Sequence, residues 1–95
     1  SRTIMKILII QTAFIGDLVL TTSFIREVSK KHPNSEIHIL VKKGTEEILE
    51  KNPYIQKIFT WDKKKSKSIF YFIKFIKELR KENYEYTYSP HFSYR

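Results

Sequence analysis

Residues 6–17, KILIIQTAFIGD, decide the fold of the chain. The first six form a short, nearly continuous apolar run rich in branched side chains, which is typical of a central parallel strand buried on both faces. Residues 12–16 follow as a loop. From Asp17 the pattern becomes helical, because Leu18, Thr21, Thr22, Ile25 and Val28 recur at spacings of three and four. This strand, loop and helix predict the opening of an α/β domain.

The rest of the chain repeats this alternation. Strands are predicted over residues 36–41, 55–61 and 84–88, and helices over 46–51, with Thr45 as the N-cap, and over 68–82. The order β-α-β-α-β-α-β predicts a Rossmann-like parallel sheet with helices on its faces. No helix follows the last strand, so we expect residues 5–95 to be the front part of a longer domain. We expect residues 1–4, which precede Met5, to be a cloning remnant.

Composition limits the classes of function. The 95 residues leave no room for two domains, and the absence of cysteine excludes disulfides and thiolate sites. Apolar runs are too short to span a bilayer and no signal-peptide pattern is present, so we expect a cytoplasmic protein. Residues 51–95 hold 11 Lys/Arg against 4 Asp/Glu and 12 of the 14 aromatic residues. This basic, aromatic half indicates an anionic partner, with phosphate as the first candidate.

Four loops follow the predicted strands, where open α/β sheets bind their ligands. In the first, Gly16 permits close backbone approach of a ligand, and Asp17 begins a helix. Spacing alone favours a capping role for this aspartate. The loop is neither a GxGxxG nor a Walker A sequence. His91 follows the last strand, where a solvent-facing position is the alternative. His32 and His38 are expected to be structural, and the three histidines lack metal-ligand spacing, so we expect no metal.

Several segments together resemble a known family. They are MKILIIQTAFIGDLVLTT (5–22), PNSEIHILV (33–41), NPYI (52–55) and SPHFSYR (89–95). This ordered set is similar to the N-terminal part of the ADP-heptose:lipopolysaccharide heptosyltransferases, glycosyltransferase family 9. The resemblance implies a GT-B architecture of two Rossmann-like domains, of which residues 5–95 would be a partial acceptor-side domain without the donor domain. It also implies inverting heptose transfer to the lipopolysaccharide inner core, with no metal or covalently bound cofactor.

The resemblance assigns roles to particular residues. Asp17 matches the proposed general base, which shifts our interpretation of this residue from capping to catalysis. A donor-phosphate loop would comprise Thr12, Ala13 and Gly16, although Ala13 replaces a frequent small hydroxyl residue. An acceptor-side cleft would comprise His91, Ser93 and Arg95, with Lys63, Lys64 and Lys65 as a basic rim. Phe92 stands where a basic residue is common, which weakens the match at that position.

The implied partners are a nucleotide-sugar donor, ADP-heptose or similar, and an anionic glycolipid acceptor at the inner face of a membrane, with no nucleic acid. The fragment alone is expected to be inactive. Two alternatives stay open. One is a flavodoxin-like module that binds phosphorylated or nucleic-acid ligands, for which the net charge of +7 over residues 51–95 is the evidence. The other is self-association through an uncovered sheet edge and helix face. Within the last helix, Phe72, Ile73, Phe75 and Ile76 are expected to be core.

Overall fold

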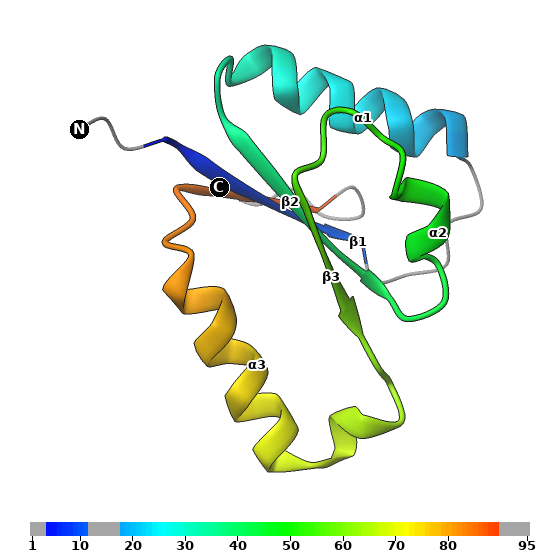
Figure 1. Cartoon of the computed structure of the whole chain (residues 1–95), viewed down its shortest axis with the longest axis vertical. Coiled ribbons are helices and arrows are strands. Elements are labelled where there is room, and N and C mark those ends of the chain that lie inside the picture. The colour runs from blue at the N-terminus through cyan, green and yellow to red at the C-terminus, as the bar shows by residue number, and fades with distance from the viewer. Residues whose placement is uncertain (1–3, 12–17, 90–95) are drawn as a thin grey trace.

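The chain folds around a four-stranded, all-parallel sheet with helices on both faces (Figure 1). The structure, a computed structural model, describes residues 4–11 and 18–89. The strands are β1 (Lys6–Gln11), β2 (Glu36–Lys42), β3 (Lys57–Trp61) and β4 (Tyr86–Tyr88); the helices are α1 (Leu18–Lys31), α2 (Glu46–Leu49), the 3₁₀ turn η1 (Lys65–Lys67) and α3 (Ile69–Lys81). The prediction of an α/β parallel sheet is therefore confirmed, and the strands lie side by side in the order β3-β2-β1-β4.

The central strand β1 is fixed by pairing on both sides. It pairs with β2 over its whole length, from Lys6 opposite Glu36 to Gln11 opposite Val41. On its other side it pairs with β4, where Ile9 lies opposite Tyr88. Because successive residues of a strand point to opposite faces, a strand of Ile and Leu in this position supplies both layers of core.

One face of the sheet is covered by α1 and α2. Ile7 and Ile9 of β1 lie there with Ile37, Ile39 and Val41 of β2, all almost completely buried. The helices add Ile25 and Val28 from α1 and Leu49 from α2. Of the positions that the spacing predicted for the buried side of α1, Thr21, Ile25 and Val28 are buried and Thr22 is exposed. Leu49 is the residue that holds the short α2 in place.

The other face is covered by α3. Its small core contains Leu8, Leu40 and Phe59, against which Phe75 and Leu79 of α3 are packed while still partly exposed. The contacts are aromatic, since the Phe75 ring lies 4.9 Å from that of Trp61. No residue of α3 is fully buried. Phe72 and Ile73 are 49% and 46% exposed, so the expectation that both belong to the core is wrong.

Several element ends differ from the sequence prediction. The helix α2 ends at Leu49 instead of 51, and Thr45 makes no side-chain cap; its hydroxyl donates instead to the Lys42 carbonyl at 2.7 Å. Strands β3 and β4 begin two residues later than predicted. Ser68 caps α3 by accepting from the backbone N–H of Tyr71. At the other end of this helix, Asn83 takes a positive φ of 56°.

Candidate functional site

The carboxyl ends of β1 and β4 mark the point where the sheet changes direction. From β1 the chain builds outward through β2 to β3 and then crosses to the other side of β1 to form β4. In open α/β sheets such a switch point is the usual ligand crevice. Gln11, the last residue of β1, is buried here at 3% exposure. Chain continuity attaches residue 12 to Gln11 and residue 90 to Ser89, so two predicted segments begin from neighbouring strand ends.

Most of the predicted site residues belong to those two segments. They lie outside the described residues, and their roles stay predictions: Thr12, Ala13, Gly16, Asp17, His91, Ser93 and Arg95. What the structure supplies is the position of the strands from which they extend. The sequence alone could not predict that these strand ends are neighbours. About three-quarters of the chain separates β1 from β4, and the two strands become neighbours only through the crossover.

The predicted lysine rim follows β3, at the far edge of the sheet from β4. Lys63, Lys64 and Lys65 are all exposed. Since neighbouring strands lie about 4.8 Å apart, three strand spacings separate the β3 and β4 ends by roughly 14 Å. The structure thus brings the lysines to the carboxyl edge of the sheet but does not place them beside the strand end that leads to His91.

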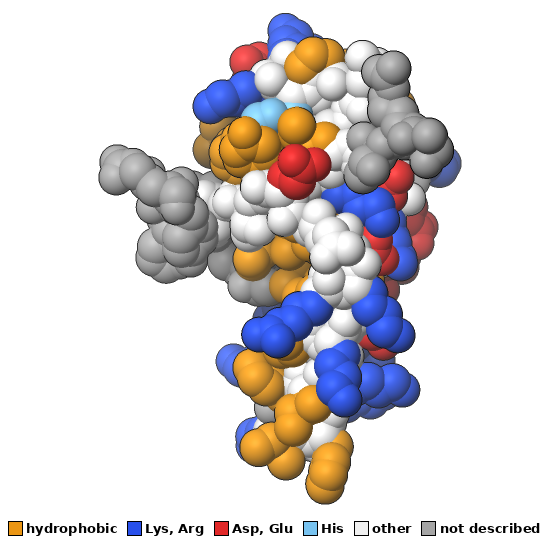
Figure 2. Space-filling view, turned by 90° about the vertical axis from the view of Figure 1, so that its left-hand side faces the viewer, with side chains coloured by type: hydrophobic (Ala, Val, Ile, Leu, Met, Phe, Trp, Pro, Cys, Tyr) orange, Lys and Arg blue, Asp and Glu red, His pale blue; other side chains and the backbone are white. Residues whose placement is uncertain are grey.

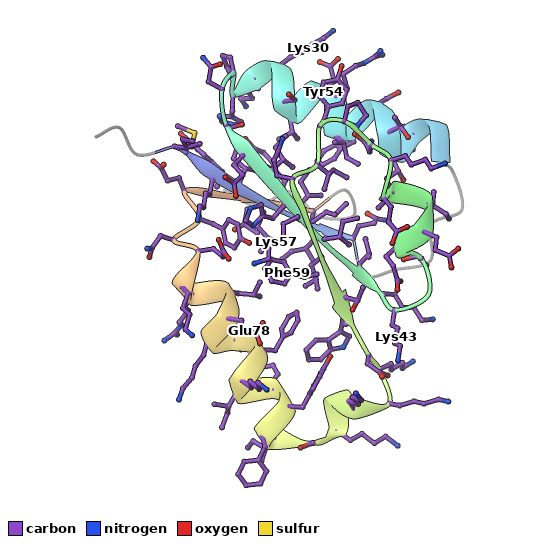
Figure 3. The ribbon with its side chains drawn as sticks, viewed as in Figure 1. Lys30, Lys43, Tyr54, Lys57, Phe59 and Glu78 are labelled. Atoms are coloured by element: carbon purple, nitrogen blue, oxygen red, sulfur yellow. The ribbon has the colours of Figure 1, made fainter. Side chains whose placement is uncertain are left out.

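Asp62 organises the start of this lysine segment. One carboxylate oxygen accepts from the backbone N–H of Lys64 at 3.0 Å, and the other pairs with the Lys43 ammonium at 3.5 Å. Partial burial acts to raise the pKa of Asp62, but the Lys64 N–H and the Lys43 charge together outweigh it and lower that pKa. Figure 3 shows Lys43 at this end of β3. Asp62 is therefore held as a carboxylate that neutralises part of the local positive charge.

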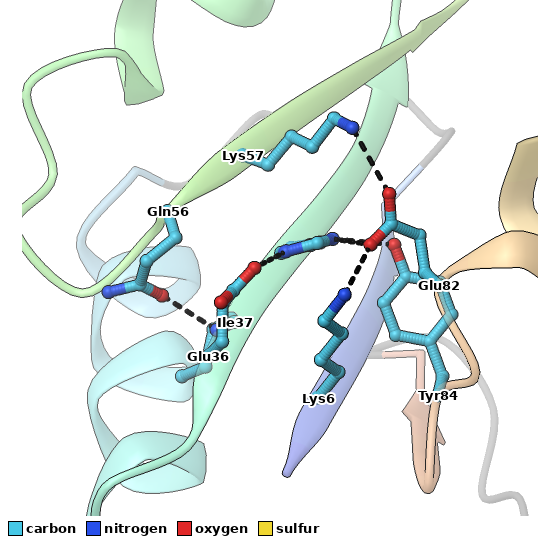
Figure 4. Close-up of polar contacts among 8 residues, drawn as sticks. Lys6, Glu36, Ile37, Gln56, Lys57, Glu82 and Tyr84 are labelled. Atoms are coloured by element: carbon cyan, nitrogen blue, oxygen red, sulfur yellow. Dashed lines mark hydrogen bonds and ion pairs between the residues drawn. The ribbon is translucent and has the colours of Figure 1, made fainter. Parts of the chain in front are cut away.

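A polar cluster that sequence reasoning missed lies at the opposite, amino ends of the strands, facing α3 (Figure 4). His38 is 1% exposed and sits between the Glu36 carboxylate and the Tyr84 hydroxyl, which is 2.7 Å from its Nδ1. Because a carboxylate only accepts, Nε2 donates to Glu36, and in the neutral ring Nδ1 accepts from Tyr84. Burial, reinforced by the nearby Glu82 and Glu36 carboxylates, raises the pKa of the Tyr84 phenol.

Glu82 binds the end of α3 to this cluster. Its two oxygens accept from Lys6 at 2.9 Å and from Lys57 at 3.1 Å. These hydrogen bonds, the one to Lys6 first, lower the pKa of Glu82 to about 2. The Lys57 ammonium also lies 4.9 Å from the centre of the Phe59 ring; Figure 3 shows both residues on β3. Every carboxylate of the cluster has a partner, and we assign the cluster to stability. A glutamate directly after a helix that ends in Arg80 and Lys81 was its one sequence signal.

A shallow hollow of about 420 Å³ lies between α1 and β4. It is lined by Phe24, Glu27, Val28, Lys30, Lys31 and Tyr88. These helix residues belong to the last turns of α1. In a βαβ unit the helix runs back toward the amino ends of the strands, so the hollow lies away from the carboxyl edge. The neighbouring His32 is a structural residue, as predicted, with a 2.7 Å hydrogen bond to the Tyr88 hydroxyl.

The described residues hold neither a metal-binding group nor a membrane-spanning helix. Within residues 4–11 and 18–89, no group of three or more His, Cys, Asp or Glu residues is arranged to hold a metal ion. The helices of the same residues include none that is long and apolar enough to cross a membrane.

Comparison with known proteins gives one informative similarity. Over 75 residues, the chain is 36% identical to lipopolysaccharide heptosyltransferase 3 of Escherichia coli. The match covers 76% of this chain but only 22% of that protein. No protein-family model matches the chain, and no solved structure matches it either. Most of the chain is thus similar to a small part of a heptosyltransferase.

Proposed function

We propose that the chain is the N-terminal, acceptor-side part of a GT-B glycosyltransferase. The parent enzyme would transfer heptose from ADP-heptose to the lipopolysaccharide inner core with inversion. The similarity to a heptosyltransferase supports the class of reaction. The single observation that carries the site is the pairing of β1 with β4. It brings the strand ends that lead to residues 12–17 and 90–95 to adjacent positions at the switch point of the sheet.

In this mechanism Asp17 is the general base. Its carboxylate takes the proton of the acceptor hydroxyl while that oxygen attacks the anomeric carbon of the donor sugar. The bond from that carbon to the diphosphate breaks on the opposite face, ADP leaves with the bonding electrons, and the configuration inverts. Thr12, Ala13 and Gly16 would approach the donor phosphates, since a glycine and a helix N-terminus allow close contact with an anion. His91, Ser93 and Arg95 would contact the acceptor.

The proposed substrates determine where the enzyme works. A nucleotide sugar is soluble, whereas the acceptor is an anionic glycolipid, so the protein would act in the cytoplasm against the inner face of a membrane. The mechanism uses no metal and no covalently bound cofactor. The donor-binding half would come from the rest of the parent protein. Because proximity of donor and acceptor supplies much of the catalysis, we expect the 95-residue chain alone to transfer no sugar.

The test is an Asp17→Asn substitution in the complete enzyme, assayed with ADP-heptose and a lipid-linked core acceptor. General-base catalysis is worth about 10²–10⁴-fold, so kcat should fall by that factor while donor binding is retained. Glu27→Gln, which changes an exposed carboxylate of α1, is the control and should leave kcat unchanged. An Asp17→Asn enzyme with normal kcat would disprove the base assignment. Transfer by the isolated chain would disprove the need for a second half.

A further inference from the structure

The N-terminal half of α3 exposes a cluster of large apolar side chains. Ile69 is 66% exposed, Phe70 81%, Phe72 49% and Ile73 46%. Figure 2 shows hydrophobic side chains gathered at this lower end of the molecule, with Lys and Arg side chains around them. The helix packs Phe75 and Leu79 against the sheet, and Phe72 meets it through an edge contact with Trp61. The exposed parts of the four residues form a second apolar surface. We call it the α3 apolar patch.

Positive charge surrounds the patch. The fifteen residues 63–77 contain six lysines and no Asp or Glu. Four of the lysines are in the segment that leads into α3, which includes η1, and Lys74 and Lys77 lie on the helix itself. All six are exposed. Asp62 and Glu78, the acidic residues that flank this stretch, stand outside it, and Asp62 is already paired with Lys43. The surface therefore combines projecting apolar groups with a single sign of charge.

We propose that the α3 apolar patch and its lysines dock the protein on an anionic lipid bilayer. Side chains of Ile69, Phe70 and Ile73 would enter the boundary between headgroups and acyl chains, while the lysines meet the lipid phosphates. Surfaces that dock on membranes combine large apolar side chains such as Phe and Ile with neighbouring Lys side chains. The inference deepens the proposed function, because it names the surface by which the enzyme reaches a membrane-bound acceptor.

Other occupants fit the patch less well. A protein partner is disfavoured because Lys is depleted from protein–protein interfaces. A single-stranded nucleic acid would use stacking on aromatic faces, whereas two of the four patch residues, Ile69 and Ile73, are aliphatic and offer no π-face. A lipid surface uses both the apolar groups and the lysines. Aliphatic and aromatic side chains both gain from leaving water, and the lysines are attracted to the lipid phosphates.

Vesicle binding by the 95-residue chain tests the proposal. Vesicles of phosphatidylcholine alone are compared with vesicles of phosphatidylcholine and phosphatidylglycerol in equal parts, by co-sedimentation at low and high salt. Trp61 is the only tryptophan, and its ring lies 6.4 Å from that of Phe72, so quenching by brominated lipid reports docking of this surface. We expect binding to the anionic vesicles, weakened by salt and accompanied by quenching.

Two variants and two controls locate the surface. Ile69→Ser with Phe70→Ser should lower the partition coefficient at least tenfold. Lys64→Gln, Lys65→Gln and Lys67→Gln together should lower it about 100-fold, since each lysine near an anionic surface strengthens binding about fivefold. The controls are Ile48→Ser on α2 and a triple change of Lys30, Lys31 and Lys51 to Gln, which removes as much charge elsewhere. All these side chains are exposed, and circular dichroism checks that each variant keeps the fold.

The outcomes separate this proposal from its competitors and from the proposed function. It is overturned if the wild-type chain does not bind anionic vesicles, or if the control variants weaken binding as much as the patch variants. It is also overturned if light scattering shows a dimer that the Ile69 and Phe70 changes dissociate, or if a single-stranded oligonucleotide displaces the vesicles. Vesicle binding requires no heptose transfer, so failure of the glycosyltransferase assignment would leave the vesicle result valid. Failure of vesicle binding would equally leave the glycosyltransferase assignment open to its own test.

Discussion

Replacing Glu82 with glutamine should release the end of α3 from the sheet. The carboxylate accepts from Lys6 at 2.9 Å and Lys57 at 3.1 Å, and its side chain is only 16% exposed. Its pKa falls from 4.5 to about 2. At 1.36 kcal/mol for each tenfold change in the ionisation equilibrium, this lowering corresponds to a ceiling of about 3 kcal/mol. Because both lysines are partly exposed to solvent, screening reduces the expected loss in free energy of unfolding to about 1–2 kcal/mol.

The pH dependence identifies the cause. A carboxyl group whose pKa is lowered in the folded state stabilises the protein fully above its unfolded value and loses this effect as the pH falls through the folded value. The contribution of Glu82 should therefore be present above about pH 4.5 and vanish near pH 2. Glutamine has no charge to lose. The difference between the wild-type chain and Glu82→Gln should accordingly be largest at neutral pH and shrink steadily in acid.

Urea unfolding at pH 7, 4 and 2.5, followed by Trp61 fluorescence and circular dichroism, measures both quantities. Glu78→Gln is the matched control, because Glu78 is an exposed carboxylate one turn earlier on the same helix. Its substitution should change the free energy of unfolding by less than about 0.5 kcal/mol. Equal effects of the two substitutions at pH 7 would refute the pairing of Glu82. A difference that persists undiminished at pH 2.5 would refute its electrostatic origin.

Two other residues should show specific effects on stability. Leu49→Ala removes the one buried side chain of α2 and should lower the free energy of unfolding in urea by about 2–4 kcal/mol. Ile48 is half-exposed on the same helix, so Ile48→Ala should lower it far less. Equal losses would show that α2 does not dock through Leu49. Asn83 has a φ of 56°, a left-handed conformation that Gly adopts easily and a β-branched residue does not. Asn83→Gly should therefore be tolerated, and Asn83→Val should lower the free energy of unfolding in urea by about 1–2 kcal/mol. A Val variant as stable as the wild type would contradict this backbone conformation.

The element order could be predicted because its signals are local. Residues 6–11 form the strand β1 with the predicted bounds, and Thr21, Ile25 and Val28 of α1 are buried as its periodicity predicted. Long-range partners could not be predicted. Glu82 pairs with Lys6, 76 positions earlier, and with Lys57, 25 positions earlier. His38 was expected to be structural, but nothing near it in sequence pointed to Tyr84. Pairs of this kind exist only once the sheet and α3 have assembled.

The buried side of α3 was misjudged for a different reason. Apolar residues occupy most of the circumference of its first three turns, so periodicity does not distinguish the side that packs from the side that faces solvent. The aromatic residues of β3 make the choice, because Phe59 and Trp61 offer ring contacts to Phe75 at 6.4 Å and 4.9 Å. Tyr71 is drawn to the same side and its hydroxyl accepts from the Asp62 N–H. Ile69, Ile73 and Phe70 are thereby left exposed.

The crossover from β3 to β4 links the proposed site to the proposed docking surface. Ile7, Leu8 and Ile9 are buried on both faces of β1, so a chain segment must cover the second face, and the segment that does so is α3. The same crossover carries the chain past β1 and places β4 beside it, which creates the switch point. The lysines begin this crossover, and it ends at Tyr86, where β4 begins. A membrane bound at α3 would therefore be held in a fixed position relative to the strand ends that lead to Asp17 and His91.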